Sequence, residues 1–354
     1  QAMSGLLKII DGTSRSPLIW FVHCLLRLLS LPYRLVIYWR NVHFDKGHRV
    51  TRVSVPVISI GNLTTGGTGK TPMVKYVAQW LRDCGLRVTL LSRGYRAEAD
   101  QPNDEALELE RRLPDVPHLQ NPNRVESAQV AIEEFAAQIL LLDDGFQHRF
   151  LERDLDIVLI DATCPFGYGR LLPAGLLREP VTALNRADVA IITRTDRVSA
   201  EELQQIRQQI GSVNNDLPII EFGHAIDGLE NYSGELVDCE HLQGERVLVF
   251  SGIGNHQAFK ALLESRKYDI VCDIEFADHY HYDRTDIERI CQRAQEHSAS
   301  TVICTMKDLV KIQVDQLGEF PLWALAVSLE PTAEKAELDM ALGKIVDLVG
   351  PDEL

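Results

Sequence analysis

The chain has 354 residues, of which 45% are hydrophobic and 25% charged, and its formal net charge is -15 at pH 7. This length leaves room for two domains with buried cores, and the acidic balance argues against a nucleic-acid-binding protein. The seven cysteines are scattered and form no C-x-x-C pair, so we interpret them as reduced thiols of a cytoplasmic protein.

The amino-terminal segment differs from the rest of the chain, because its first 52 residues carry eight Lys and Arg against two acids. Residues 17–44 are apolar, but Arg27, Pro32 and Arg34 interrupt the run, and no signal-peptide cleavage site follows. We therefore expect two short helical pieces joined near Pro32 that lie in an anionic membrane surface rather than cross it. A buried helix that covers the main domain is the alternative.

From residue 55 onwards, short β-rich runs alternate with helical stretches, which is typical of a parallel sheet covered by helices on both faces. The first predicted strands are 55–60, 87–92, 138–144, 155–161, 187–193 and 218–222, with predicted helices at 71–84, 103–112 and 124–136. After an irregular stretch, in which a linker and a small hairpin are expected, further strands are predicted at 246–254, 268–276, 300–305 and 321–327. Helices are predicted near 255–266, 284–298 and 333–348.

The stretch ISIGNLTTGGTGKTP at 58–72 follows a predicted strand and opens a predicted helix, which is the context of a phosphate-binding loop. Glycines let backbone N–H groups converge on phosphate oxygens, and the helix amino terminus adds its positive end. Lys70 is expected to reach the β- and γ-phosphates of ATP, and Thr71 to bind Mg²⁺. Thr64 replaces the first Gly of the strict GxxxxGK[ST] pattern, so the loop has the variant form GGxGKT. The predicted nucleotide-binding residues are Thr65, Gly66, Gly67, Thr68, Gly69, Lys70 and Thr71.

These elements predict an α/β chain with a P-loop NTPase-like, three-layer α/β/α domain, a second smaller α/β domain and an amino-terminal membrane-associating helix. The expected divisions are a helical segment at 1–46, a kinase domain at 47–225, a linker at 226–245, the second domain at 246–330 and a carboxy-terminal helix at 331–354.

The run LLLDDGFQHR at 140–149 ends an apolar strand in two carboxylates. An Asp at the carboxyl tip of a strand beside the phosphate-loop strand is the Walker B arrangement, which holds Mg²⁺. Because neighbouring side chains on a strand alternate, Asp143 and Asp144 cannot both point into the sheet, and we favour Asp144 as the metal ligand. Gln147 and His148 follow within one turn and are candidates for the same site.

Together these motifs resemble the tetraacyldisaccharide 4′-kinases of lipid A biosynthesis. The resembling blocks are VPVISIGNLTTGGTGKTP (55–72), LSRGY (91–95), DDGFQH (143–148), LPAGLLREP (172–180), FADHY (276–280) and TMKDLVK (305–311). The resemblance implies phosphorylation by ATP of the 4′-hydroxyl of a membrane-embedded acylated glucosamine disaccharide 1-phosphate, giving lipid IVA and ADP. It also implies a peripheral protein on the cytoplasmic face of the inner membrane.

The resemblance further implies roles for single residues. Besides Lys70 and Thr71, it places Asp143, Asp144, Gln147 and Glu179 around the metal, and Arg124 and Arg178 near the transferring phosphoryl group. Arginines there would neutralise the charge that develops during transfer.

The same resemblance implies that Asp104 is the base that accepts the hydroxyl proton, with help from His279. This chain departs from the family pattern around the base, because Asn103 and Ala106 stand where the family has Gly and Pro. In the TMKDLVK block, Met306 replaces the family's usual Glu.

Two other classes of protein share some of these features. A membrane-associated, variant-P-loop ATPase that positions or partitions protein cargo would also have GGxGKT and an amphipathic anchor, but that class usually has Lys where this chain has Thr65. A nucleotide-dependent interaction module is the second, because ITRTD (192–196) resembles a guanine-reading loop, although such strand-end Arg and Asp residues are commonly structural.

Overall fold

The computed structural model describes residues 17–94, 104–278 and 280–350. These residues form two compact units, which we call the first unit and the second unit. The first unit takes residues 17–94, 115–224 and 329–350, and the second takes 104–114, 225–278 and 280–328. The division differs from the one expected from the sequence, because residues 104–114 belong to the second unit although the first unit surrounds them in the chain.

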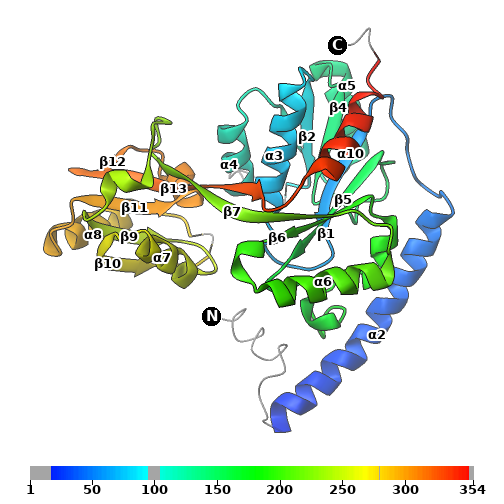
Figure 1. Cartoon of the computed structure of the whole chain (residues 1–354), viewed down its shortest axis with the longest axis horizontal. Helices are drawn as coiled ribbons and strands as arrows, with labels where there is room; N and C mark the ends of the chain where they lie inside the picture. The colour runs from blue at the N-terminus through cyan, green and yellow to red at the C-terminus, as the bar shows by residue number, and fades with distance from the viewer. Residues whose placement is uncertain (1–16, 95–103, 279, 351–354) are drawn as a thin grey trace. The chain divides into compact units, whose positions relative to one another are not determined.

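A parallel sheet with the strand order β7-β6-β5-β1-β4-β2-β3 forms the centre of the first unit (Figure 1). Its strands are β1 (Val57–Asn62), β2 (Val88–Ser92), β3 (His118–Gln120), β4 (Ile139–Asp143), β5 (Leu155–Asp161), β6 (Val189–Thr193) and β7 (Ile219–Glu230). Every residue of β1, β2, β5 and β6 is buried, as continuous apolar runs require. The predicted α/β fold is confirmed; the sequence missed β3, which is three residues long and has no apolar run.

Helices cover both faces of this sheet. They are α3 (Lys70–Asp83), α5 (Arg124–Phe135), α6 (Ala200–Val213) and α10 (Ala336–Val346), with short 3-10 turns η1 (Gly167–Gly169), η2 (Val181–Arg186) and η3 (Thr195–Arg197). On one face, Ala128 of α5 packs with Val57, and Ile206 of α6 packs with Val158. Helix α3 packs against β1, β2 and β4, and Figure 1 shows it beside α10 on the near side of the sheet.

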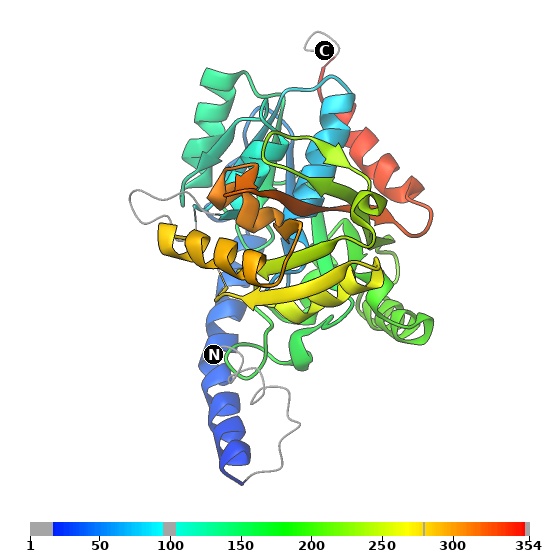
Figure 2. The same ribbon diagram turned by 90° about the vertical axis from the view of Figure 1, so that its left-hand side faces the viewer.

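A single continuous helix, α2 (Pro17–Asp45), replaces the two pieces that the sequence predicts. Pro32 lies inside it, since a helix of 29 residues keeps enough backbone hydrogen bonds to carry one missing N–H. Residues 19–45 are long and apolar enough to cross a membrane by length and composition, and the apolar window within them is not buried in the protein. The alternative interpretation, a buried helix that covers the main domain, is therefore wrong for the apolar window of α2. In both views α2 projects from the rest of the first unit (Figures 1 and 2).

The second unit has its own parallel sheet, in the order β10-β9-β11-β13. Its strands are β9 (Arg246–Ser251), β10 (Asp269–Glu275), β11 (Thr301–Thr305) and β13 (Phe320–Pro331), with β12 (Gln316–Leu317) antiparallel to β13. Its helices are α4 (Asp104–Arg112), α7 (His256–Ser265), α8 (Arg284–Glu296) and α9 (Met306–Ile312). Alternate residues of β9 face two clusters: Phe250 packs with α8 and α9, and Val249 packs with α7.

The stretch expected to be a linker is partly ordered structure. It contains the end of β7, the short strand β8 (Leu236–Val237) paired antiparallel to it, and the 3-10 turn η4 (Cys239–Leu242). Arg111 and Arg112 of α4 both pair with Glu230 at the end of β7, which fixes α4 within the second unit.

Candidate active site

The phosphate loop leaves the carboxyl end of β1 and enters α3 at Lys70. Gly66 and Gly69 have φ values of 119° and 83°, which favour glycine over other residues. A Cβ atom built on Gly66 meets nothing within 4 Å, so the loop faces open space at this point. Pro72 lies in the first turn of α3, where a missing N–H costs no helix hydrogen bond. The local geometry is therefore that of an anion-binding loop at a helix amino terminus.

Hydrogen bonds to the ends of β1 and β6 and to the LPAG segment fix the loop. Asn62 Nδ2 donates to Thr68 Oγ1 at 2.9 Å, and Thr193 Oγ1 donates to the carbonyl oxygen of Thr68 at 2.9 Å. The backbone N–H of Thr65 donates to the carbonyl oxygen of Leu176 at 2.8 Å. Thr68 therefore serves to fix the loop, while the glycines leave its outer side open.

Asp144 connects the phosphate loop to the LPAG segment. Lys70 Nζ lies 3.6 Å from its Oδ1, and Arg178 Nη1 donates to both carboxylate oxygens at 2.9 and 2.8 Å. Burial would raise the pKa of Asp144, but Lys70 and Arg178 outweigh it and hold that pKa below its usual value. The structure thus brings Lys70, Asp144 and Arg178 together, with Asp144 ionised at neutral pH.

Gln147 links this cluster to β1. Its Nε2 donates to the carbonyl oxygen of Asn62 at 2.8 Å, and its Oε1 accepts a hydrogen bond from Arg178 at 3.3 Å. The predicted residues Asp143 and Asp144 lie at the end of β4, directly beside β1, as the Walker B interpretation requires. Thr71, on the first turn of α3, is almost fully buried.

Glu179 lies next to Arg178 in the chain but has different partners. It is fully buried, and its carboxylate accepts hydrogen bonds from Arg186 at 3.0 and 3.3 Å and from Asn41 at 2.9 Å. The two neighbours therefore do not form the exposed ion pair that their sequence also allows. A carboxylate satisfied by an arginine and an amide favours a structural role for Glu179 over metal binding.

Arg124 is the first residue of α5 and is only 5% exposed, so it is not a surface charge at a helix start. Its Nε is buried and has no hydrogen-bond partner among the described residues. Burial lowers the pKa of Arg124, and Asp144 and Asp143 oppose that shift. A buried guanidinium near two carboxylates and with a donor to spare suits a phosphate group.

His148 belongs to the same environment. Burial, followed by the positive charges of Arg124 and Arg153, lowers the pKa of His148 to about 4. The imidazole is therefore neutral at physiological pH, and His148 is no candidate for a cation that binds phosphate.

Arg194 is a residue whose position the sequence did not predict. It follows β6 in a left-handed conformation (φ 59°), and its Nη2 lies 3.9 Å from a Cβ atom built on Gly67. Its guanidinium pairs with Asp161 at the end of β5. The ITRTD segment thus places a guanidinium beside the phosphate loop, while the ion pair with Asp161 gives the same residue a structural role.

Of the two residues expected to accept the proton, Asp104 belongs to the second unit. Asp104 is the first residue of α4, and its side chain is not among the described ones. His279 lies outside the described residues, between Asp278 and Tyr280. The structure therefore places the backbone of Asp104 in the second unit, and the role of His279 stays a prediction.

Asp308 organises the loops at the carboxyl edge of the second unit's sheet. It is fully buried and accepts hydrogen bonds from Gly252 N at 3.1 Å and from Tyr282 Oη at 2.8 Å. Lys311 Nζ donates to the carbonyl oxygen of Tyr280 at 3.0 Å. The TMKDLVK block therefore fixes Tyr280 and Tyr282, and Met306, which replaces the family's Glu, is buried in the hydrophobic core of this unit.

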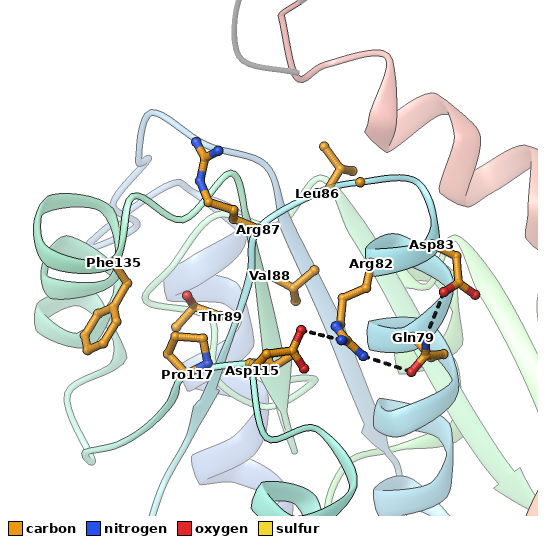
Figure 3. Close-up of a pocket in the computed structure, with 12 residues that line it drawn as sticks. Gln79, Arg82, Asp83, Leu86, Arg87, Val88, Thr89, Asp115, Pro117 and Phe135 are labelled. Atoms are coloured by element: carbon orange, nitrogen blue, oxygen red, sulfur yellow. Dashed lines mark hydrogen bonds and ion pairs between the residues drawn. The ribbon is translucent and has the colours of Figure 1, made fainter.

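A hollow of about 340 Å³ lies at the opposite edge of the first unit's sheet, where β2 begins (Figure 3). Figure 3 shows Arg82 between Asp115 and Gln79, so the basic group there is already paired. Because the phosphate loop follows the carboxyl end of β1, this hollow is not part of the candidate active site.

Comparisons with known proteins agree on one family. The family model described as tetraacyldisaccharide-1-P 4′-kinase matches residues 22–347. The chain is 36% identical over 348 residues to a tetraacyldisaccharide 4′-kinase of Syntrophus aciditrophicus, covering 91% of this chain and 93% of that protein. It is 37% identical over 331 residues to one from an Anaeromyxobacter species, covering 88% and 86% of the two chains.

A solved structure agrees with the sequence comparisons. The crystal structure of LpxK from Aquifex aeolicus in complex with ATP aligns with a TM-score of 0.74 at 29% identity, covering 92% of this chain and 99% of that one. The region matched by the family model, residues 22–347, includes the phosphate loop, the Asp144 cluster and most of both units. This chain therefore belongs to the tetraacyldisaccharide-1-P 4′-kinase family, whose members phosphorylate a lipid A precursor.

Proposed function

We propose that the chain transfers the γ-phosphoryl group of ATP to the 4′-hydroxyl of an acylated glucosamine disaccharide 1-phosphate at a membrane surface, giving lipid IVA and ADP. The observation that carries the proposal is the cluster of Lys70, Asp144 and Arg178 beside an open glycine loop. Two cations held by one carboxylate next to an anion-binding loop provide the charge that phosphoryl transfer needs.

The residues at the loop also suit Mg²⁺ bound together with a nucleotide. No group of three or more His, Cys, Asp or Glu side chains that could hold a metal occurs among the described residues. Mg²⁺ on kinases needs fewer protein ligands, since it keeps waters and binds substrate phosphates. Thr71 and Asp144, with Asp143 nearby, would hold it, and when bound it would neutralise charge on the transferring group.

Each cation has a separate task in the transfer. Lys70 would contact the β- and γ-phosphates, and Arg178, now paired with Asp144, would balance charge as the bond to ADP breaks. Arg124 has a buried Nε donor without a partner among the described residues, which we assign to the same phosphate group. Arg194 would add positive charge beside Gly67.

The acceptor hydroxyl must lose its proton as it attacks. The 4′-oxygen forms a bond to the γ-phosphorus while the bond from that phosphorus to ADP breaks, and Asp104 takes the proton. His279 would support Asp104, and the hydrogen bonds of Asp308 with Tyr282 and of Lys311 with Tyr280 fix the residues that follow it in the chain.

The exposed face of α2 supports action at a membrane surface. Large apolar side chains on it are mostly solvent-exposed; they include Trp20, Phe21, Leu25, Leu28, Leu29, Leu31, Leu35, Val36, Tyr38 and Trp39. Apolar residues next to arginines on one helix suit the boundary between acyl chains and anionic headgroups. We place the protein on the cytoplasmic face of the inner membrane, bound through α2.

The test is transfer of label. The protein is incubated with γ-labelled ATP, Mg²⁺ and an acylated glucosamine disaccharide 1-phosphate in mixed micelles. We expect label in the lipid and its dependence on Lys70. Release of free phosphate without labelled lipid would contradict the proposal and favour a membrane-associated ATPase.

A further inference from the structure

The carboxyl-terminal half of α2 is hydrogen-bonded directly to residues of the candidate active site. Tyr33 Oη donates to the carbonyl oxygen of Arg178 at 2.8 Å. The Arg40 guanidinium donates to the carbonyl oxygen of Gln147. Because the side chains of Arg178 and Gln147 bond to each other and Arg178 binds Asp144, α2 holds both ends of one network.

A third contact involves the buried carboxylate of Glu179. Asn41 Nδ2 donates to Glu179 Oε2 at 2.9 Å, and Arg186 donates to the same carboxylate from the other side. A fully buried carboxylate depends strongly on each of its donors, because a lost partner leaves charge unsatisfied away from water. Asn41 therefore helps to fix the peptide next to Arg178.

The end of α2 also fastens the segment that follows Gln147. Arg149 donates to Asp45 at 2.7 Å and to the carbonyl oxygen of Asn41 at 3.3 Å. The rings of Phe44 and Phe150 meet edge to face with centroids 5.0 Å apart. One face of this half of α2 is packed, with Ile37 and Phe44 buried, whereas other apolar side chains of the same half, such as Trp39, are exposed.

We propose that Tyr33, Arg40 and Asn41 are positioning residues for phosphoryl transfer. They fix the backbone at Arg178 and Gln147 so that the Arg178 guanidinium stays on Asp144, and Asp144 stays beside Lys70. None of the three touches the reacting groups. The proposal rests on the proposed function and extends it, because it makes the membrane-binding helix a part of the active-site scaffold.

The test compares Tyr33→Phe and Arg40→Leu with matched controls in the full-length protein. Tyr76→Phe is the control for the first, since it also removes one tyrosine hydroxyl of the first unit, which bonds to Lys335 at 3.1 Å. Arg40→Lys is the control for the second, because lysine keeps a donor for the Gln147 carbonyl. The measurements are kcat and the KM values for ATP and lipid in mixed micelles, nucleotide binding by calorimetry, the thermal midpoint, and co-sedimentation with phosphatidylglycerol-containing vesicles.

We expect Tyr33→Phe and Arg40→Leu to lower kcat by about three- to tenfold, the effect of losing one hydrogen bond from an aligned site. Nucleotide affinity should fall as well, while vesicle binding and the KM for lipid stay at wild-type values. Tyr76→Phe should match the wild type, and Arg40→Lys should recover most of the loss.

Three outcomes would overturn the proposal. The first is a wild-type kcat in both Tyr33→Phe and Arg40→Leu. The second is a loss of kcat in Tyr76→Phe as large as that in Tyr33→Phe. The third is a loss of kcat that is fully explained by weaker vesicle binding, since α2 would then be only an anchor. Failure of the proposed function would give a different result, because the wild-type protein itself would then label no lipid. Even in that case, a lower nucleotide affinity of Tyr33→Phe would still show that α2 positions residues of the site. If Arg40→Leu does not fold, the comparison of Tyr33→Phe with its control Tyr76→Phe still decides the matter.

Discussion

Both units present loops at the carboxyl edge of a parallel sheet, but the two edges have different chemistry. In the first unit, the edge carries paired and partly buried charges, centred on Lys70, Asp144 and Arg178. In the second unit, Asp308 accepts hydrogen bonds from the backbone N–H of Gly252 and from the hydroxyls of Tyr282 and Thr305, and burial raises its pKa. Aromatic rings pack beside it, with Phe250 and Tyr282 centroids 5.5 Å apart.

This difference indicates that the two edges serve different halves of the reaction. A charged edge suits a polyphosphate and its metal, because the opposing charges are already in place. An edge in which hydroxyls and rings surround one buried carboxylate holds a loop in position. We therefore assign the phosphoryl donor to the first unit and the proton-accepting residues to the second.

The largest effect should come from removing the base. Asp104→Asn and His279→Ala should each lower kcat by about two to four orders of magnitude, since proton acceptance is lost while the phosphate site stays intact. Steady-state transfer to the lipid measures this, and calorimetry should show unchanged nucleotide binding. Asp269→Asn, an exposed carboxylate of the second unit, is the control. Near-normal turnover in either variant would remove that residue from the mechanism.

The next effect tests the charged edge. Lys70→Ala should lower kcat/KM by about 10²- to 10³-fold, because one preorganised cation is lost from the phosphate site. In contrast to the base variants, it should also weaken nucleotide binding. Lys344→Ala removes an exposed lysine of α10 and should have no effect. Nucleotide binding that is unchanged in Lys70→Ala would break the assignment of the donor to the first unit.

A smaller effect is expected at Asp308. Asp308→Asn keeps one acceptor oxygen but puts an amide group near the N–H of Gly252 and the hydroxyl of Tyr282, so the loop around His279 should shift. We expect kcat to fall about tenfold with unchanged nucleotide binding. Tyr282→Phe removes only one of these bonds and should have the milder defect. A loss of nucleotide binding in Asp308→Asn would contradict the separation of the two edges.

The smallest effect concerns stability in acid. Burial lowers the pKa of His118 on β3 to about 4, well below the value of about 6.5 in an unfolded chain. Between these values only the unfolded state takes up the proton, so the free energy of unfolding falls as the pH drops from 6.5 to 4. His118→Gln can keep the hydrogen bond to Ser92, so it should weaken this pH dependence. Urea unfolding at pH 7 and pH 5 measures it, and parallel losses in both proteins would show that His118 is not the cause.

The sequence predicted the fold well where local pattern and burial agree. The strands at 155–161 and the helix at 124–136 match β5 and α5 to within a residue, because their apolar runs and start signals are local. The prediction of the fold failed where contacts between residues far apart in the chain determine the structure. Nothing local shows that α4 belongs to the second unit, since that depends on Arg111 and Arg112 meeting Glu230 far along the chain.

The site shows the same limit. The motifs predicted which residues gather at the phosphate loop, because glycines, Lys70 and the strand-end carboxylates have fixed spacing. The motifs did not predict which ion-pair and hydrogen-bond partners these residues have in the folded protein. Arg178 pairs with Asp144, whereas its neighbour Glu179 bonds to Arg186 and Asn41. The folded backbone gives these two neighbouring side chains different partners.

The interleaving of the two units has a consequence for how the protein is made. The first unit is completed by residues 329–350, where Thr332 N donates to the carbonyl oxygen of Glu221 at 2.9 Å and Lys335 reaches Tyr76 on the phosphate-loop helix. During synthesis, the phosphate loop leaves the ribosome more than two hundred residues before these partners do. The first unit must therefore wait, with part of its surface uncovered, while the whole second unit is translated. Completion of the first unit is therefore a late event in synthesis, because it needs residues 329–350.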